Sequence, residues 1–264
     1  MSRTVLLTGA AGRIGRALLD RLPALGWELR PFDRESTPGG VVGDITSPAD
    51  LDRATAGVDA IVHLAGQPTE APWPVIRAAN VEGLVQLFEA ARRAGVRRVV
   101  YASSNHAVGF EPLPAAGELP DGLPPRPDTL YGVSKAFGEA LARYYVDRYG
   151  FQVACLRIGT FEDRPSHPRS LASWLSPGDA ARLVDAALRS PELTYAVVWG
   201  ISGNTRRTWS LAGARALGYE PQDDAEAYAG EVVAAGPDPS DGFVGGGFTS
   251  AGFGIDEITS RWGG

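Results

Sequence analysis

Lysine is almost absent from this chain. Among 25 basic residues in 264, Lys135 is the only lysine and all the others are arginines. A compact ammonium with an adjustable pKa is chemically different from a planar guanidinium that is always charged. Since arginine is the basic residue everywhere else in the chain, the single lysine indicates that the chemistry at position 135 requires an ammonium.

Cysteine, histidine and long apolar runs are also scarce, and each scarcity excludes a class of protein. Cys155 is the only cysteine, so it cannot form an internal disulfide, and its apolar strand pattern predicts a buried, inert thiol. The three histidines are scattered and indicate no metal site. No apolar run reaches the roughly 18 residues needed to cross a bilayer, and no basic, apolar leader precedes the first predicted strand. We therefore expect a cytoplasmic protein without membrane contact.

The charge balance argues against a nucleic-acid partner. The formal net charge is −6, and the arginines form no basic clusters. Proteins that bind phosphate backbones concentrate positive charge on one face or segment. The net charge indicates little else about the partners of this protein.

Alternating strand and helix patterns predict an α/β protein. At 264 residues and 44% hydrophobic composition, residues 1–264 are expected to form a single Rossmann-type domain. The pattern is typical of a doubly wound, mostly parallel seven-stranded sheet, with a small C-terminal substrate-binding region at 202–264. Predicted strands are 3–8, 27–32, 40–43, 58–64, 96–103, 151–158 and 195–201; predicted helices lie near 13–25, 48–56, 74–94, 129–149 and 178–189.

Two irregular segments leave the carboxyl ends of predicted strands. Residues 107–128 are rich in proline and glycine, and residues 160–177 follow the sixth strand. Ligands of open α/β sheets bind at this edge, so both segments are expected on the substrate side. The glycine-rich stretch from about 237 carries no pattern that assigns it a role.

A glycine-rich turn follows the first strand and opens the first helix. Its sequence is Gly9-Ala10-Ala11-Gly12-Arg13-Ile14-Gly15, which allows backbone N–H groups to approach a pyrophosphate. Asp33 ends the second strand, where a carboxylate can accept the ribose hydroxyls and repel a 2′-phosphate. The pair predicts NAD as the cofactor, although Arg34 beside Asp33 leaves tolerance of NADP open.

Further residues are expected along the cofactor. Asn80 stands inside a helical pattern although asparagine is a poor helix former, which indicates a backbone-organising or cofactor-side role. The others follow strands or neighbour the site: Asp44, Ile45, Leu64, Ala65, Gly66, Ile158 and Phe161.

Tyr131 and Lys135 form the candidate catalytic pair. Their spacing of four residues places both side chains on one face of a helix. A phenol is a poor base at neutral pH, and a nearby ammonium favours its phenolate form. Off the fifth strand, Ser103-Ser104-Asn105-His106 delivers hydroxyl, amide and imidazole groups to the same rim, and Ser104 is the preferred hydroxyl for polarising a substrate oxygen.

At these residues the chain resembles the extended short-chain dehydrogenases/reductases (the NAD-dependent epimerase/dehydratase family) and, within them, the uronate dehydrogenases. The resemblance runs from residue 4 to about 235. It rests on five strings: Thr8-Gly9-Ala10-Ala11-Gly12, Ser103-Ser104-Asn105-His106, Tyr131-Gly132-Val133-Ser134-Lys135, Arg157-Ile158-Gly159-Thr160 and Val197-Val198-Trp199-Gly200.

The resemblance implies a role for each matching residue. Tyr131 would be the base and Lys135 its support, while Ser104, Asn105 and His106 would hold a sugar. Thr160 would touch the substrate, and Arg169 would pair with the sugar carboxylate. The chain departs from the family at Gln67-Pro68-Thr69, where a serine is familiar, so Pro68 and Thr69 are expected near the sugar; Thr160 also replaces a serine.

The implied reaction is NAD-dependent oxidation of the C1 hydroxyl of a cyclic uronic acid, such as glucuronate or galacturonate, to an aldarolactone. A homo-oligomer is also expected. Two alternatives stay open: a nucleotide-sugar epimerase or dehydratase of the same fold, and a dinucleotide-sensing regulatory protein without chemistry.

Overall fold

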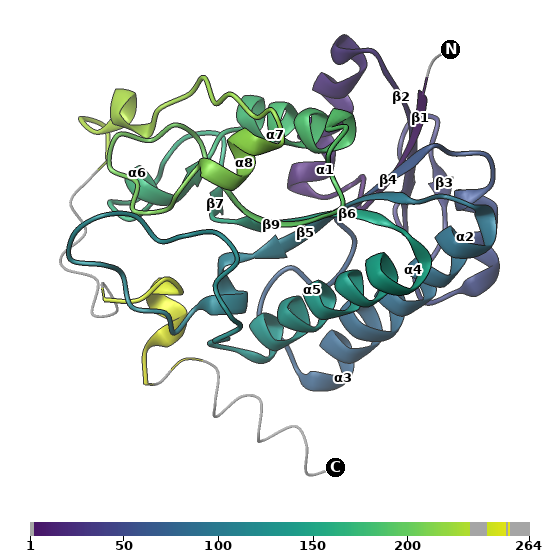
Figure 1. The fold of residues 1–264 in the computed structure, drawn as a ribbon, viewed down its shortest axis with the longest axis horizontal. Helices are drawn as coiled ribbons and strands as arrows, with labels where there is room; N and C mark the ends of the chain where they lie inside the picture. Colours follow the sequence, from purple (N-terminus) through teal and green to yellow (C-terminus); the bar gives the residue numbers. More distant parts are fainter. Residues whose placement is uncertain (1–2, 233–241, 252, 254–264) are drawn as a thin grey trace.

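A computed structural model describes residues 3–232, 242–251 and 253, and its centre is one parallel sheet with helices on both faces (Figure 1). The sheet has seven strands in the order β3-β2-β1-β4-β5-β6-β9, and all its pairings are parallel. The predicted seven-stranded Rossmann-type sheet is confirmed. Its strands are β1 Arg3–Thr8, β2 Trp27–Asp33, β3 Val41–Val42, β4 Ala60–His63, β5 Arg98–Ser104, β6 Gln152–Ile158 and β9 Tyr195–Gly200.

The register brings the ends of the central strands together. Thr8 pairs with His63, His63 with Tyr101, and Ser104 with Ile158. The loops that follow β1, β4, β5 and β6 therefore leave from one edge of the sheet. In a doubly wound sheet this edge holds the ligand crevice.

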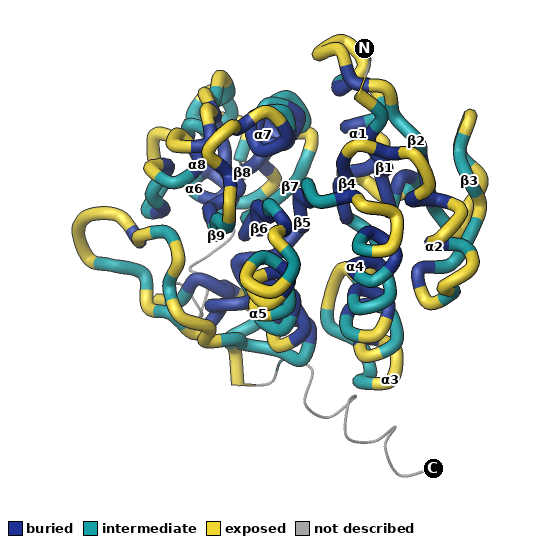
Figure 2. The backbone as a smooth tube through the Cα atoms, turned by 45° about the vertical axis from the view of Figure 1, so that its right-hand side comes forward, coloured by how far each residue is buried: buried dark blue, intermediate teal, exposed yellow. Residues whose placement is uncertain are grey.

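Two apolar cores cover the two faces of the sheet. One packs α1 (Arg13–Arg21) and α7 (Pro177–Arg189) against one face, and the other packs α2 (Pro48–Thr55), α4 (Gly83–Ala94) and α5 (Leu130–Tyr149) against the opposite face. Figure 1 shows α1 and α7 above the sheet and α4 and α5 below it, and Figure 2 shows their buried inner sides. Cys155 lies on β6 in the second core and is fully buried, as predicted.

Local capping chemistry explains where the helices begin. Ser47 and Ser176 accept hydrogen bonds from Asp50 N and Asp179 N, and each serine is followed by a proline at the first helical position. Thr129 caps α5 by accepting from Gly132 N at 3.0 Å. The predicted starts of these three helices are therefore within one residue of the observed starts.

Two predicted helices are interrupted. The helix expected at 13–25 ends at Arg21 and continues as a 3-10 turn, Leu22–Leu25, because Pro23 cannot donate to the α-helical ladder. The helix expected at 74–94 consists of α3 (Trp73–Ile76), a π-helical segment (Arg77–Glu82) and α4. Single π turns inside helices are often found at functional sites.

The segment after β6 contains short elements that the sequence patterns do not predict. β7 (Thr160–Phe161) pairs with β8 (Trp174–Leu175) in a separate two-stranded parallel sheet, and α6 (Ser170–Ser173) lies between them. Later come α8 (Ala212–Ala216) and two 3-10 turns, Ala225–Tyr228 and Gly246–Thr249. None of the helices in the described ranges is long and apolar enough to cross a membrane.

Candidate active site

The glycine turn after β1 is a close-packed backbone cradle. Gly9 has a φ of 73°, and a Cβ there would lie 2.7 Å from Ala65 N. A Cβ at Gly15 would clash with the carbonyl of Gly9. No side chain caps the start of α1, where Gly12 is the N-cap residue. The first N–H groups of this helix thus face the cleft without a side-chain acceptor, which suits a phosphate.

Asp33 is tied directly to this turn. Its Oδ2 accepts from Ala11 N at 2.9 Å and its Oδ1 accepts from Glu35 N at 3.1 Å. These bonds hold the carboxylate beside the glycine turn, at the end of β2. Arg34 lines the same part of the cleft.

One cleft of about 900 Å³ runs from the glycine turn to the start of α5. Its lining includes most of the predicted site residues, namely Gly9, Gly12, Arg13, Ile14, Gly15, Asp33, Asp44, Ile45, Leu64, Ala65, Gly66, Pro68, Ser104, Asn105, His106, Tyr131, Lys135, Ile158 and Phe161. Four predicted residues lie outside the lining: Thr69, Asn80, Thr160 and Arg169. The cleft thus joins the expected cofactor residues to most of the expected sugar residues.

Tyr131 and Lys135 lie at the junction of these two groups. Lys135 Nζ donates to Ala102 O at 2.7 Å and lies 5.5 Å from the centre of the Tyr131 ring. Burial raises the pKa of Tyr131 to about 12, and a hydrogen bond with Ser104 opposes that shift. Burial lowers the pKa of Lys135 to about 8, and the charge of Glu139 opposes this shift in part. Both groups are thus moved from their ordinary values mainly by loss of water.

The two serines at the end of β5 face different partners. Ser103 donates to Glu139 Oε1 at 2.6 Å, and this carboxylate also holds the buried guanidinium of Arg157. Ser104 donates to Asn105 Oδ1 at 3.1 Å and accepts from His106 N at 3.2 Å. Ser104 is also the serine whose hydrogen bonding lowers the pKa of Tyr131, and both residues line the cleft.

Asn80 is a backbone organiser in this structure. It is buried within the π-helical segment, where its Oδ1 accepts from Gln67 N at 2.7 Å and its Nδ2 donates to Gln67 O and to Ser134 Oγ. It therefore fixes the loop after β4 against α5. Of the two roles that the sequence leaves open for Asn80, the contacts favour the first.

Glu70 ties that same loop to the start of α5. Its Oε2 accepts from the backbone N of Tyr131 at 2.8 Å, so a carboxylate meets the positive end of the helix. Glu70 directly follows the unusual Gln67-Pro68-Thr69 string, but no sequence pattern predicts its contact with α5.

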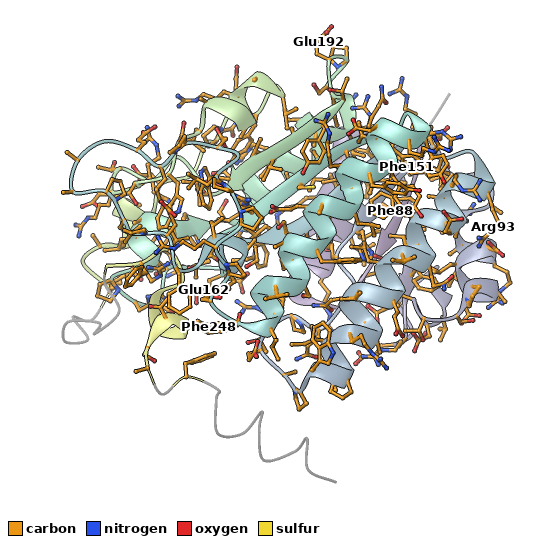
Figure 3. The ribbon with its side chains drawn as sticks, turned by 60° about the horizontal axis from the view of Figure 1, so that its bottom comes forward. Phe88, Arg93, Phe151, Glu162, Glu192 and Phe248 are labelled. Atoms are coloured by element: carbon orange, nitrogen blue, oxygen red, sulfur yellow. The ribbon has the colours of Figure 1, made fainter. Side chains whose placement is uncertain are left out.

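The C-terminal segment 242–251 closes the sugar end of the cleft. Asn105 Nδ2 donates to Val244 O at 3.1 Å, and the guanidinium of Arg169 donates to the carbonyls of Phe243 and Val244. Phe248, labelled in Figure 3, stacks on His106 with ring centres 4.2 Å apart and lines the cleft. No motif in the glycine-rich stretch predicted this contact.

Comparison with known proteins places this architecture in a family. The model of the NAD dependent epimerase/dehydratase family matches residues 5–212. The chain belongs to the NAD dependent epimerase/dehydratase family. The family membership expected from the motifs is confirmed.

Several relatives share 40% identity with this chain, and two of them carry different names. One is a uronate dehydrogenase of Agrobacterium fabrum, matched over 250 residues that cover 92% of this chain and 94% of that protein. The other is an NAD-dependent glucose-6-phosphate dehydrogenase of Haloferax volcanii, matched over 251 residues that cover 85% and 95%. A solved structure of a uronate dehydrogenase variant from Agrobacterium tumefaciens, complexed with NAD, superposes with a TM-score of 0.87 at 38% identity and covers 94% and 97%.

Proposed function

We propose that the protein oxidises the C1 hydroxyl of a cyclic uronic acid, such as glucuronate or galacturonate, to an aldarolactone, with NAD as the hydride acceptor. The observation that carries this proposal is the position of Tyr131. It lies with Ser104 and Lys135 where the glycine cradle meets the amide of Asn105 and the imidazole of His106. The uronate dehydrogenases among its relatives support the choice of substrate.

The cleft residues fit NAD. The glycine cradle has no room for a Cβ at Gly9 or Gly15, and the uncapped start of α1 can meet the pyrophosphate. Asp33 is anchored where it can accept the adenosine ribose hydroxyls and repel a 2′-phosphate. When bound, NAD⁺ supplies the acceptor for the hydride that leaves C1.

Tyr131 takes the proton. As C1 loses a hydride, its hydroxyl proton passes to Tyr131 Oη, and the C1–O bond becomes the lactone carbonyl. The phenolate is unfavourable in a buried site, as the raised pKa of Tyr131 shows. The Lys135 ammonium favours the phenolate, and Ser104 favours it when its hydroxyl hydrogen turns from Asn105 Oδ1 to Tyr131 Oη, so these three residues act together.

Asn105, His106 and Arg169 would hold the sugar. Asn105 and His106 line the cleft next to Tyr131. Arg169 is half-buried behind the C-terminal segment, and its pairing with the sugar carboxylate remains part of the proposal. A buried carboxylate is costly to desolvate unless a cation meets it, and a guanidinium can do so with two parallel bonds.

A sugar phosphate is the second candidate substrate, because one relative with 40% identity is named a glucose-6-phosphate dehydrogenase. The decisive experiment measures initial rates of NAD reduction with glucuronate, galacturonate, glucose, glucose 6-phosphate and a nucleotide sugar. The proposal expects the two uronates to give the highest kcat/KM. Preference for glucose 6-phosphate or the nucleotide sugar would replace it, and no oxidation at all would favour a regulatory role.

Arg169→Ala separates carboxylate recognition from general support of the pocket. Charge-assisted bonds contribute about 1.5–3 kcal/mol, so kcat/KM for glucuronate should fall roughly 10- to 150-fold. Activity with neutral glucose should start low and change little. An equal loss with both sugars would mean that Arg169 acts through the C-terminal segment it holds.

The cytoplasm as the site of action and a homo-oligomeric state are also proposed. Cell fractionation and sedimentation velocity would test them.

A further inference from the structure

Asp128 is a buried carboxylate two residues before α5, and no sequence pattern singles it out. Its side chain is fully buried, and its Oδ2 lies 2.7 Å from Nδ1 of His106. His106 itself lines the cleft, stacks on Phe248 and meets the edge of Tyr131 at 5.9 Å between ring centres. The buried carboxylate of Asp128 thus contacts Nδ1 of His106, and His106 also faces the substrate pocket.

Three glycines from three parts of the chain make room for this carboxylate. A Cβ at Gly109 or at Gly245 would fall closer to Asp128 Oδ2 than the 3.0 Å that real Cβ atoms keep. A Cβ at Gly132 would lie 3.1 Å from Asp128 Oδ1. The segment after β5, the start of α5 and the C-terminal segment therefore all pack closely around one charged group.

The hydrogen bonds around Asp128 determine which nitrogen of His106 carries a proton. Gly132 N–H donates to Thr129 Oγ1 at 3.0 Å, so the Thr129 hydroxyl hydrogen goes to Asp128 Oδ1 at 2.9 Å. An ionised carboxylate only accepts, and the start of a helix favours its negative charge. Asp128 Oδ2 must then accept from His106 Nδ1–H.

We infer that Asp128 is a positioning residue that fixes His106 in the Nδ1–H tautomer, so that the neutral ring presents its Nε2 lone pair to a hydroxyl of the sugar. The choice of a sugar as ligand rests on the proposed function. With Nδ1 engaged by Asp128, Nε2 is the nitrogen that a ligand in the cleft can reach. The stack on Phe248 restricts rotation of the ring, so the lone pair has a fixed direction.

The tautomer is testable on the wild-type protein by ¹⁵N NMR. The chain has only three histidines, His63, His106 and His167, and the signals lost in His106→Gln identify the residue of interest. At pH 8 we expect His106 to show a protonated Nδ1 and an unprotonated Nε2. The opposite tautomer, or a ring protonated on both nitrogens, would overturn the inference, and neither reading depends on enzyme activity.

Kinetics then test whether the tautomer matters for the reaction. The Thr129 hydroxyl and His106 Nδ1–H each donate to a different oxygen of Asp128, and the asparagine side chain has only one acceptor oxygen. Asp128→Asn therefore loses about one hydrogen bond, so kcat/KM for glucuronate should fall roughly tenfold. The dissociation constant of NAD should not change. Asp20→Asn, at an exposed position, is the matched control and should match the wild type.

A double-mutant cycle separates positioning from a structural role. If Asp128 acts through His106, Asp128→Asn should change kcat/KM less than twofold in a His106→Ala background. The same tenfold loss in both backgrounds would overturn the inference. Should Asp128→Asn fail to fold, the NMR result on the wild type still decides. A wild type that oxidises no uronate would instead contradict the proposed function and leave the tautomer result standing.

Discussion

The cofactor side and the substrate side of the cleft are built in different ways. The cofactor side uses turns at the ends of adjacent strands β1, β2 and β4, all within the first quarter of the chain, and its contacts are mostly backbone. The substrate side joins residues far apart, such as Asn105 and Val244, which are separated by 139 positions. One side is a local backbone structure, whereas the other exists only after distant segments have packed.

The substitution with the largest expected effect removes the catalytic hydroxyl and leaves both sides of the cleft unchanged. Tyr131→Phe deletes one hydroxyl at the junction, so turnover should fall by the roughly 10²–10⁴-fold that a positioned base supplies. The dissociation constant of NAD, measured by titration, should stay near the wild-type value. Near-normal turnover would remove Tyr131 from the catalytic role.

Gly15→Ala should weaken NAD binding and leave the substrate side of the cleft unchanged. The added Cβ meets the Gly9 carbonyl, which is backbone and cannot move aside cheaply. A displaced turn would no longer present its N–H groups to the pyrophosphate, and hydrogen bonds to a charged group contribute about 1.5–3 kcal/mol, so the dissociation constant of NAD should rise roughly 10- to 150-fold. Gly230→Ala is the control because a Cβ there meets nothing within 4 Å. Unchanged NAD affinity in Gly15→Ala would mean that the turn does not hold the cofactor.

Gly245→Ala should weaken substrate binding and leave the cofactor side of the cleft unchanged. Its Cβ would clash with Asp128 and push away the segment that carries Phe248. We expect KM for glucuronate to rise roughly tenfold, with NAD affinity preserved. Gly247→Ala lies two residues away in open space and should behave as wild type. A parallel loss of NAD affinity would show that the two sides are not independent.

The smallest effect concerns stability and the buried ammonium. Lys135 has a pKa of about 8 in the folded protein against an ordinary 10.5, so between these values the unfolded chain binds more protons. The stability of the wild type therefore rises with pH from 8 to 10.5, whereas below pH 8 the penalty for burying the charge is fully present. The inactive variant Lys135→Met should have the higher Tm at pH 7, by a few degrees, and lose that advantage toward pH 10. A Tm difference that does not depend on pH would contradict this assignment.

The residues predicted for the cofactor side, except Asn80, line one cleft, and their determinants are local. A strand, a glycine turn and a helix follow one another, and Asp33 ends the next strand, so periodicity and turn chemistry suffice. All seven strands of the main sheet were predicted within two residues at either end. The helix at 74–94 was predicted without its π segment, because a π turn leaves the apolar pattern almost unchanged.

The substrate side was only partly predictable. Ser104 ends β5, and Asn105 and His106 follow it directly, so the strand pattern places all three at the cleft. Asp128 and Phe248 take their roles from packing between distant segments. A glycine-rich stretch resembles a surface loop in sequence, and only the fold shows that Gly245 is small because a carboxylate lies against it.

The contacts of segment 242–251 also set the order in which a newly made chain can become active. The ribosome releases the glycine turn, Asp33 and the catalytic helix long before Val244 and Phe248 emerge. The residues of the dinucleotide cradle are therefore made before the C-terminal partners of Asn105 and His106. A chain that stops short of residue 242 would contain every residue of the cradle and would lack the contacts that Val244 and Phe248 make with Asn105 and His106.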